Sequence, residues 1–217
     1  MRIEDHLLRC DGVEFTESPN IGDPFEPGYP DTIVIHYTAC RDPGAAVATL
    51  TDPGRKVSAH LVVPREGAVT QLVRFDTVAW HAGVSVWKGR TALNRFSLGI
   101  EVDNAGRLEA RDGRYLAHFG DSYPAAETVR AVHRNETGAA YWHAYPESQL
   151  DVVELLCRLL IAEYGIVEIV GHEEIAPDRK VDPGPAFPLD EMRTRLLGGT
   201  RPGVLAKGRG ASPRTAS

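Results

Sequence analysis

The sequence predicts an α/β fold: one domain with a central mixed β-sheet flanked by helices. Short apolar, β-branched runs typical of buried strands alternate along the chain with stretches in which apolar residues recur at helical spacing. The chain has 217 residues, of which 42% are hydrophobic and 25% charged, which suits one globular domain with a sizeable core.

The first strand of the core is expected at Thr32–Tyr37. Its nearly unbroken apolar and β-branched run is typical of a strand covered on both faces. Before it, residues 1–31 are rich in Pro, Gly and Asp, so we expect an extended N-terminal arm. The main domain is therefore expected to span residues 32–198.

A short helix and a hairpin follow the first strand. The helix is expected over Ala45–Leu50 and is ended by the sequence DPG at 52–54. The hairpin consists of two apolar runs, Val57–Val63 and Ala68–Phe75, joined by a turn that contains Glu-Gly at 66–67.

A further strand is predicted at Ser97–Asp103. Its alternation directs Leu98, Ile100 and Val102 to one face and the carboxylate of Glu101 to the other. That carboxylate therefore faces either solvent or a cleft.

Residues 104–147 have the least regular pattern, and we interpret them as an insertion lining the groove. The pattern predicts a short helix near Ala125–His133. An aromatic cluster follows, formed by Tyr141, Trp142 and Tyr145.

The C-terminal part contains the clearest helix, Leu150–Tyr164, with an apolar stripe at 3.6-residue spacing and Gly165 as its C-terminal cap. A second helix is expected from Pro188 to just before Gly198. From residue 199 onward the composition is Gly, Pro, Ser, Thr and basic residues without an acid, which predicts a disordered tail over 199–217.

Charge and cysteine content narrow the function classes. The net charge of -6 argues against a general nucleic-acid-binding protein, which needs a basic face. Cys10, Cys40 and Cys157 are widely spaced and form no CxxC pattern, so neither a disulfide framework nor a cysteine-zinc site is expected.

The N-terminal sequence MRIEDHLLRCDG lacks the basic start and apolar core of a signal peptide. No apolar run reaches the roughly eighteen residues of a membrane helix. We therefore expect a cytoplasmic protein without a membrane partner, although a phage protein released by lysis would look the same.

The stretch GHEEIAPDRKVDPGPAF at 171–187 carries an imidazole, His172, and a carboxylate, Asp182, in a proline-rich loop after a strand expected at Ile166–Val170. His36 lies near the end of the first strand. A catalytic zinc site takes three such ligands and leaves a position for water. Hydrogen-bonded histidines and an ordinary Asp-Pro-Gly turn explain the same residues, so the residues alone leave both readings open. Because Ala176 stands at the fifth position of HEEIA, the HExxH motif is absent.

The stretch at 171–187 resembles the signature of the AmpD-type N-acetylmuramoyl-L-alanine amidases, which are related to phage amidases and peptidoglycan-recognition proteins. Four more segments, in the family's order, resemble it: IHYTA at 35–39, VSAHLVVPREG at 57–67, AWHAGVS at 79–85 and NRFSLGIEVDN at 94–104. The resemblance covers about residues 30–190 and implies a sheet with a zinc-binding groove along one side.

By this resemblance, the zinc ligands are His36, His172 and Asp182. Asp182 stands where phage-type relatives carry a cysteine. Glu101 matches the catalytic glutamate, the expected general base, and Lys180 matches the residue that stabilises the oxyanion. Without the resemblance, Glu101 is a solvent-facing strand residue and Lys180 a solvated loop charge.

The resemblance also suggests substrate contacts, each with a structural alternative. His60 is either a substrate contact or a satisfied core histidine, and Ala59 replaces a tyrosine that is catalytic in several phage-type relatives. Four further residues are candidates because they lie near the groove of the relatives or could meet the stem peptide: Trp80, His81, Asn94 and Arg179. Their structural alternatives are to fill the core, to cap a turn or to remain solvated.

The expected function is that of a zinc amidase that cleaves the bond between the lactyl group of N-acetylmuramic acid and L-alanine, on soluble muropeptides of cell-wall recycling or on polymeric wall. The alternatives are a non-catalytic peptidoglycan-binding module and a cysteine hydrolase using Cys40. No obligate protein partner is expected. The sequence leaves open the preferred stem peptide, the requirement for an anhydro sugar, and the oligomeric state.

Overall fold

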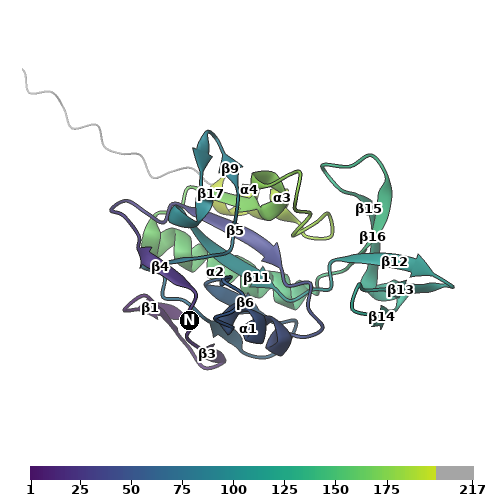
Figure 1. Cartoon of the computed structure of the whole chain (residues 1–217), viewed down its shortest axis with the longest axis horizontal. Coiled ribbons are helices and arrows are strands. Elements are labelled where there is room, and N and C mark those ends of the chain that lie inside the picture. The colour runs from purple at the N-terminus through teal and green to yellow at the C-terminus, as the bar shows by residue number, and fades with distance from the viewer. Residues whose placement is uncertain (199–217) are drawn as a thin grey trace, which may run out of the picture.

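The computed structural model describes residues 1–198, and a six-stranded mixed sheet lies at its centre (Figure 1). The strand order is β17-β5-β11-β6-β7-β3. These strands are β3 (Val13–Phe15), β5 (Thr32–Tyr37), β6 (Leu61–Val63), β7 (Val69–Gln71), β11 (Ser97–Val102) and β17 (Glu168–Gly171). β5 pairs in parallel with both β11 and β17, whereas β6 and β7 are antiparallel. The α/β class, the mixed sheet and the predicted hairpin are confirmed.

Three of the predicted helices, α1, α2 and α4, are confirmed with slightly different bounds. The helical segments are α1 (Pro43–Thr51), η1 (Leu93–Arg95), η2 (Ala125–Glu127), α2 (Glu147–Tyr164), α3 (His172–Ile175) and α4 (Leu189–Leu197). The side chain of Asp42 caps α1 by accepting a hydrogen bond from the backbone N–H of Ala45, 2.8 Å away. Gly165 ends α2 in the left-handed conformation, with φ of 68°.

The alternation of β11 separates the core from the cavity face of the sheet. Leu98, Ile100 and Val102 are buried in the main core with residues of α2 and α4. Glu101 therefore projects to the opposite face, where it is the direct register partner of His36 on β5. The expected division of β11 into an apolar face and a carboxylate face is confirmed.

Residues 104–147 contain a second, antiparallel sheet, which lies to one side of the central sheet (Figure 1). Its order is β14-β13-β12-β16-β15. The strands are β12 (Arg107–Arg111), β13 (Arg114–Leu116), β14 (Ser122–Tyr123), β15 (Thr128–Val132) and β16 (Ala139–His143).

The helix predicted near Ala125–His133 is wrong. Only the single turn of η2 is helical, and the rest of the segment is strand β15. The physical reason is that β15 is rich in β-branched residues, which favour strands and here pair with β16, for example Val129 with Trp142.

The remaining strands are short. Some lie among the N-terminal residues, and the others lie between β7 and β11. They are β1 (Arg2–Glu4), β2 (Leu7–Arg9), β4 (Ile21–Pro24), β8 (Thr77–Ala79), β9 (Val86–Trp87) and β10 (Arg90–Thr91). The region expected as an extended arm thus contains β1 to β4, and β3 forms an edge of the central sheet by pairing with β7. The tail predicted over 199–217 lies outside the described residues. Within residues 1–198, no helix combines the length and apolar character that crossing a membrane requires.

Candidate metal centre

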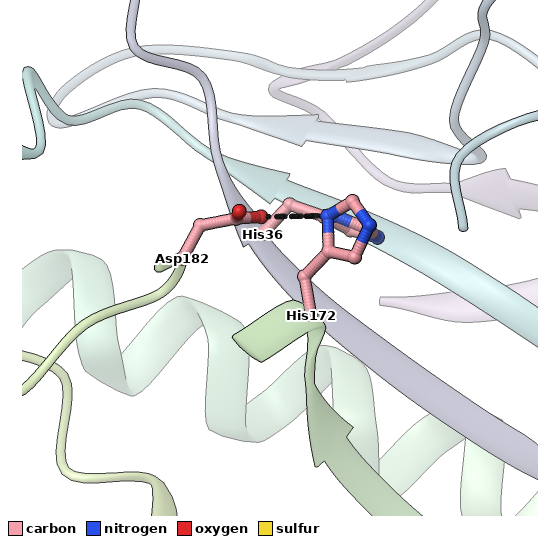
Figure 2. A group of neighbouring side chains, drawn as sticks. All are labelled: His36, His172 and Asp182. Atoms are coloured by element: carbon pink, nitrogen blue, oxygen red, sulfur yellow. Dashed lines mark hydrogen bonds and ion pairs between the residues drawn. The ribbon is translucent and has the colours of Figure 1, made fainter. Parts of the chain in front are cut away.

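Three potential metal ligands converge at the end of the parallel strands. His36 projects from β5, His172 begins α3 directly after β17, and Asp182 comes from the following loop (Figure 2). The parallel register pairs Gly171 with Ile35, so the next residue on each chain segment, His172 and His36, are neighbours. All three side chains are buried.

The three ligand atoms lie within hydrogen-bonding distance of one another. The Nδ1 atoms of His36 and His172 are 2.9 Å apart. The Oδ2 atom of Asp182 is 3.2 Å from the Nδ1 of His36 and 3.0 Å from the Nδ1 of His172. Whether protons occupy these gaps depends on the tautomers of the two rings.

The surroundings of His172 determine its tautomer. Its Nε2 lies 3.2 Å from the carbonyl oxygen of Ala82, to which it donates a hydrogen bond. The Nη2 group of Arg179 is 3.4 Å from the same nitrogen, but it also lies 3.0 Å from the carbonyl of Ala82 and 2.9 Å from that of Val84, which accept its two protons. With the proton of His172 on Nε2, its Nδ1 carries a free lone pair.

The tautomer of His36 follows from a relay through His81. The Nε2 of His81 lies 3.2 Å from the carbonyl oxygen of Ser97, so this nitrogen carries the proton. The Nδ1 of His81 therefore accepts the hydrogen bond from Nε2 of His36, 3.0 Å away. The Nδ1 of His36 is thereby also left with a lone pair.

The cluster thus fits a bound cation. Two imidazole lone pairs and one carboxylate oxygen face one another in a buried site with no proton between them, which is repulsive unless a positive ion lies at their centre. Tetrahedral zinc with bonds of 2.0–2.1 Å keeps its ligand atoms about 3.3 Å apart, close to the observed separations. Burial lowers the pKa of His36 to about 4, which maintains the neutral form that binds a metal.

Glu101 carries an unsatisfied carboxylate oxygen next to this cluster. Its Oε2 is buried and has no hydrogen-bond partner among residues 1–198. Burial, and secondarily the charge of Asp182, raise the pKa of Glu101 well above its ordinary value, although the charge of Lys180 acts in the opposite direction. A carboxylate with a raised pKa is suited to accept and return a proton near neutral pH.

A cavity of about 240 Å³ gives access to the cluster. Glu101 and Lys180 line it together with all three potential ligands. Trp80, His81 and Cys40 are also among its lining residues. The structure thus brings the residues predicted as ligands, general base and oxyanion stabiliser to one cavity.

The structure places His60 in the core rather than at this cavity. The residue is fully buried, its Nε2 donates to the carbonyl of Thr77 at 3.0 Å, and its Nδ1 accepts from the backbone N–H of Gly99 at 3.0 Å. Both ring nitrogens are therefore satisfied within the protein. This geometry favours the alternative of a satisfied core histidine.

Two of the other proposed substrate contacts, Asn94 and Arg179, bind backbone groups next to the site. The Oδ1 atom of Asn94 accepts from the backbone N–H groups of His81 and Ala82, at 3.1 and 2.7 Å. Arg179 binds the carbonyls of Ala82 and Val84, as described above. Trp80 is half-buried and faces the cavity, so among these residues its position suits a substrate contact best.

Two buried residues next to the cluster have no sequence signal that marks them. Glu173 directly follows His172, and His133 lies just after β15, and their side chains are 2% and 0% exposed. Glu173 is one of two consecutive acids at the start of a helix, which is an ordinary helix N-terminus. Only the tertiary contact between the two residues reveals a role.

Comparisons with known proteins identify the family of the chain. The profile of the N-acetylmuramoyl-L-alanine amidase family, Amidase_2, matches residues 26–185. The sequence is 36% identical to the 1,6-anhydro-N-acetylmuramyl-L-alanine amidase AmpD of Escherichia coli K12, over 74% of this chain and 69% of that protein. It is 34% identical to the E. coli K12 amidase AmiD, over 76% of this chain but only 53% of AmiD. The match therefore spans about half the length of AmiD.

Solved structures of the same two kinds of protein have the same fold. A selenomethionine derivative of AmpD superposes with a TM-score of 0.64 at 27% identity, covering 91% of this chain and 99% of that one. AmiD from E. coli, in complex with anhydro-N-acetylmuramic acid-L-Ala-D-gamma-Glu-L-Lys, gives 0.58 at 33% identity, covering 78% of this chain and 58% of that one. With the family profile matching most of the chain, we conclude that the chain belongs to the N-acetylmuramoyl-L-alanine amidase family Amidase_2.

Proposed function

We propose that the chain is a zinc-dependent N-acetylmuramoyl-L-alanine amidase, which hydrolyses the amide between the lactyl group of N-acetylmuramic acid and L-alanine. The observation that carries this proposal is the meeting of three lone-pair ligand atoms, from His36, His172 and Asp182, beside the unsatisfied carboxylate of Glu101. The membership of Amidase_2 supports the reaction class.

The three ligands would hold the zinc ion in the cavity. Bound there, zinc supplies a Lewis acid that acidifies a coordinated water and polarises the scissile carbonyl. His81 and the carbonyl of Ala82 keep the ligand rings in the tautomers that present Nδ1.

Glu101 and Lys180 complete the reaction in this proposal. Glu101 takes one proton of the attacking water at Oε2 and returns it to the departing amide nitrogen, while the remaining hydroxyl forms the new bond to the carbonyl carbon. The C–N bond breaks, so the products are a carboxylic acid on the lactyl group, which keeps the second proton of the water, and a free amine on L-alanine; at neutral pH that proton passes from the acid to the amine. The ammonium of Lys180 stabilises the negative charge that develops on the carbonyl oxygen.

The preferred substrate is proposed to be a soluble muropeptide, including the anhydro form. This rests on AmiD, which was solved in complex with an anhydromuropeptide, and on AmpD, which is named for that substrate. A second cavity, of about 450 Å³, adjoins the first and also has Tyr37 and Ala39 in its lining. Leu108 and Leu116 of the insertion line it, which supports the proposal that residues 104–147 wall the groove.

The environment of Cys40 argues against a cysteine hydrolase. The thiol faces the cavity, but its pKa is raised by burial and by the nearby carboxylates of Glu101 and Asp103. A nucleophilic cysteine needs the opposite shift, because the thiolate is the reactive form.

The test is mass spectrometry of a purified anhydromuropeptide and of intact sacculi after incubation with the protein. We expect the free anhydro sugar and the intact stem peptide, loss of cleavage after treatment with a chelator, and recovery on adding zinc. Cleavage that survives metal removal, or that occurs at a different bond, would contradict the proposal. Comparing the two substrates distinguishes recycling of soluble fragments from lysis of polymeric wall.

A further inference from the structure

The backbone of Asp182 and of the two residues that follow it is held by hydrogen bonds. Its carbonyl oxygen accepts a hydrogen bond from the backbone N–H of Glu173, at 2.8 Å. The carbonyl oxygen of Pro183 accepts from the hydroxyl of Tyr145, at 2.9 Å, and the N–H of Gly184 donates to the Oε2 of Glu173, at 3.0 Å. Two of these three hydrogen bonds join the backbone at Asp182 and Gly184 to Glu173.

The buried carboxylate of Glu173 is held in turn by the insertion. Its Oε2 accepts a hydrogen bond from the Nε2 of His133, at 2.7 Å, and its Oε1 pairs with the Nε of Arg134, at 2.9 Å. The side chain of Asn135 donates to the backbone carbonyl of Glu173, at 2.9 Å. Three consecutive residues of the β15–β16 connection thus contact one residue of α3, the helix that begins with the candidate ligand His172.

The ring of His133 has a fixed orientation and a fixed tautomer. Its Nδ1 accepts from the backbone N–H of Asn135, at 3.2 Å, so the proton is on Nε2 and points at Glu173. The ring stacks on Trp142 with centroids 5.6 Å apart. Trp142 in turn packs against Gly184, where a Cβ atom would lie 2.9 Å from the indole.

We infer that Glu173 is a positioning residue of the metal centre, and that His133 and Arg134 of the insertion hold it in place. Glu173 adjoins one ligand, His172, in the chain, and is hydrogen-bonded to the backbone carbonyl of another, Asp182, and to the N–H of Gly184 two residues further on. A shift of its carboxylate therefore moves two ligands relative to His36. This inference rests on the proposed zinc function, and it gives the sheet of residues 104–147 a part in building the metal centre.

The experiment compares the full chain with matched variants. His133→Phe keeps the ring that stacks on Trp142 but removes the donor to Glu173, and His133→Gln restores a donor near the position of Nε2. The control, Asp121→Asn, removes an exposed ion pair between the insertion and Arg41, at 3.1 Å, that includes no residue of 171–187. The readouts are the zinc dissociation constant, by competition with a chromophoric chelator, and the visible absorption of the cobalt(II)-substituted protein.

We expect His133→Phe to raise the zinc dissociation constant by about tenfold or more, and to change the cobalt d–d bands, because the ligand geometry changes. His133→Gln should lie close to the wild type in both readouts, and so should Asp121→Asn. Folded His133→Phe protein with the wild-type zinc affinity and cobalt spectrum would overturn the inference, as would equal losses in all three variants.

Should His133→Phe fail to fold, the variant Arg134→Met tests the inference instead. It removes the ion-pair partner of the Oε1 atom of Glu173, and the Arg134 side chain that it replaces is already 32% exposed. A changed cobalt spectrum with weaker zinc binding supports the inference, and unchanged values refute it. The proposed function fails separately: a zinc-loaded wild type that cleaves no muropeptide contradicts the amidase assignment, while the zinc affinities still test the role of Glu173.

Discussion

The two sheets of the molecule differ in how strongly local sequence determines them. In the central sheet, β5 is buried at five of its six residues, so its unbroken apolar run identifies a covered strand with His36 near its end. In the second sheet, β15 has no fully buried residue, and its place depends on pairing with β16. Burial on both faces makes a strand and its functional residues predictable, whereas an exposed strand is defined by its distant neighbours.

The largest effect is expected from Asp182→Ala, which changes the candidate metal centre at the end of the central sheet. Removing one of the three proposed ligands should abolish tight zinc binding and lower amidase activity by on the order of a thousandfold or more. Metal analysis after gel filtration and mass spectrometry of the muropeptide products check this. The control is Asp178→Ala, an exposed acid of the same loop, which should behave as wild type. Zinc content equal to that of the wild type would remove Asp182 from the ligand set.

A smaller loss is expected from Glu101→Gln, because the amide cannot take a proton from water. We expect kcat to fall by on the order of a hundredfold while the zinc dissociation constant stays close to that of the wild type. Steady-state kinetics and chelator competition measure the two quantities separately. Loss of zinc together with activity would instead identify Glu101 as a ligand.

Two glycines, one in each region, sharpen the comparison. A Cβ atom on Gly99 of β11 would lie 2.5 Å from the ring of His81, whereas one on Gly138 in the insertion would meet no atom within 4 Å. Gly99→Ala should therefore lower the free energy of unfolding by about 1–3 kcal/mol, and Gly138→Ala should change it by less than about 0.5 kcal/mol. Urea unfolding of both variants tests this. Equal effects would show that β11 can shift to accommodate the methyl group.

The fourth prediction concerns pH and the buried ring of His60. Burial lowers its pKa from 6.5 to about 4. The unfolded chain therefore takes up the proton first, so the stability contribution is complete above pH 6.5 and decreases as the pH falls toward 4. Between pH 7 and pH 5 the metal-free wild type should lose about 2 kcal/mol more than His60→Gln, which keeps a donor for Thr77 but does not titrate. Parallel losses in urea unfolding would assign the pH dependence to other groups.

Much of the part of the fold that carries the candidate site was predictable from the sequence. The strand of His36 and the alternation around Glu101 follow from apolar patterns, and the motif resemblance indicated which polar residues meet. The contacts of His81 were not predictable, because they depend on the space left by Gly99 and on the carbonyl of Ser97. The sequence predicts a helix where β15 forms, since the one-turn η2 and the exposed strand give no clear period.

The candidate ligands are far apart along the chain, with His172 standing 136 positions after His36. Only the folded chain brings them together, so an ion bound by them acts as a cross-link that the denatured ensemble lacks. Free zinc at a thousandfold excess over the dissociation constant would stabilise the native state by about 4 kcal/mol. The melting temperature, measured against buffered zinc concentration, would thus report occupancy of the site without any substrate. Zinc binding would also make the heat resistance of the protein depend on the zinc concentration around it.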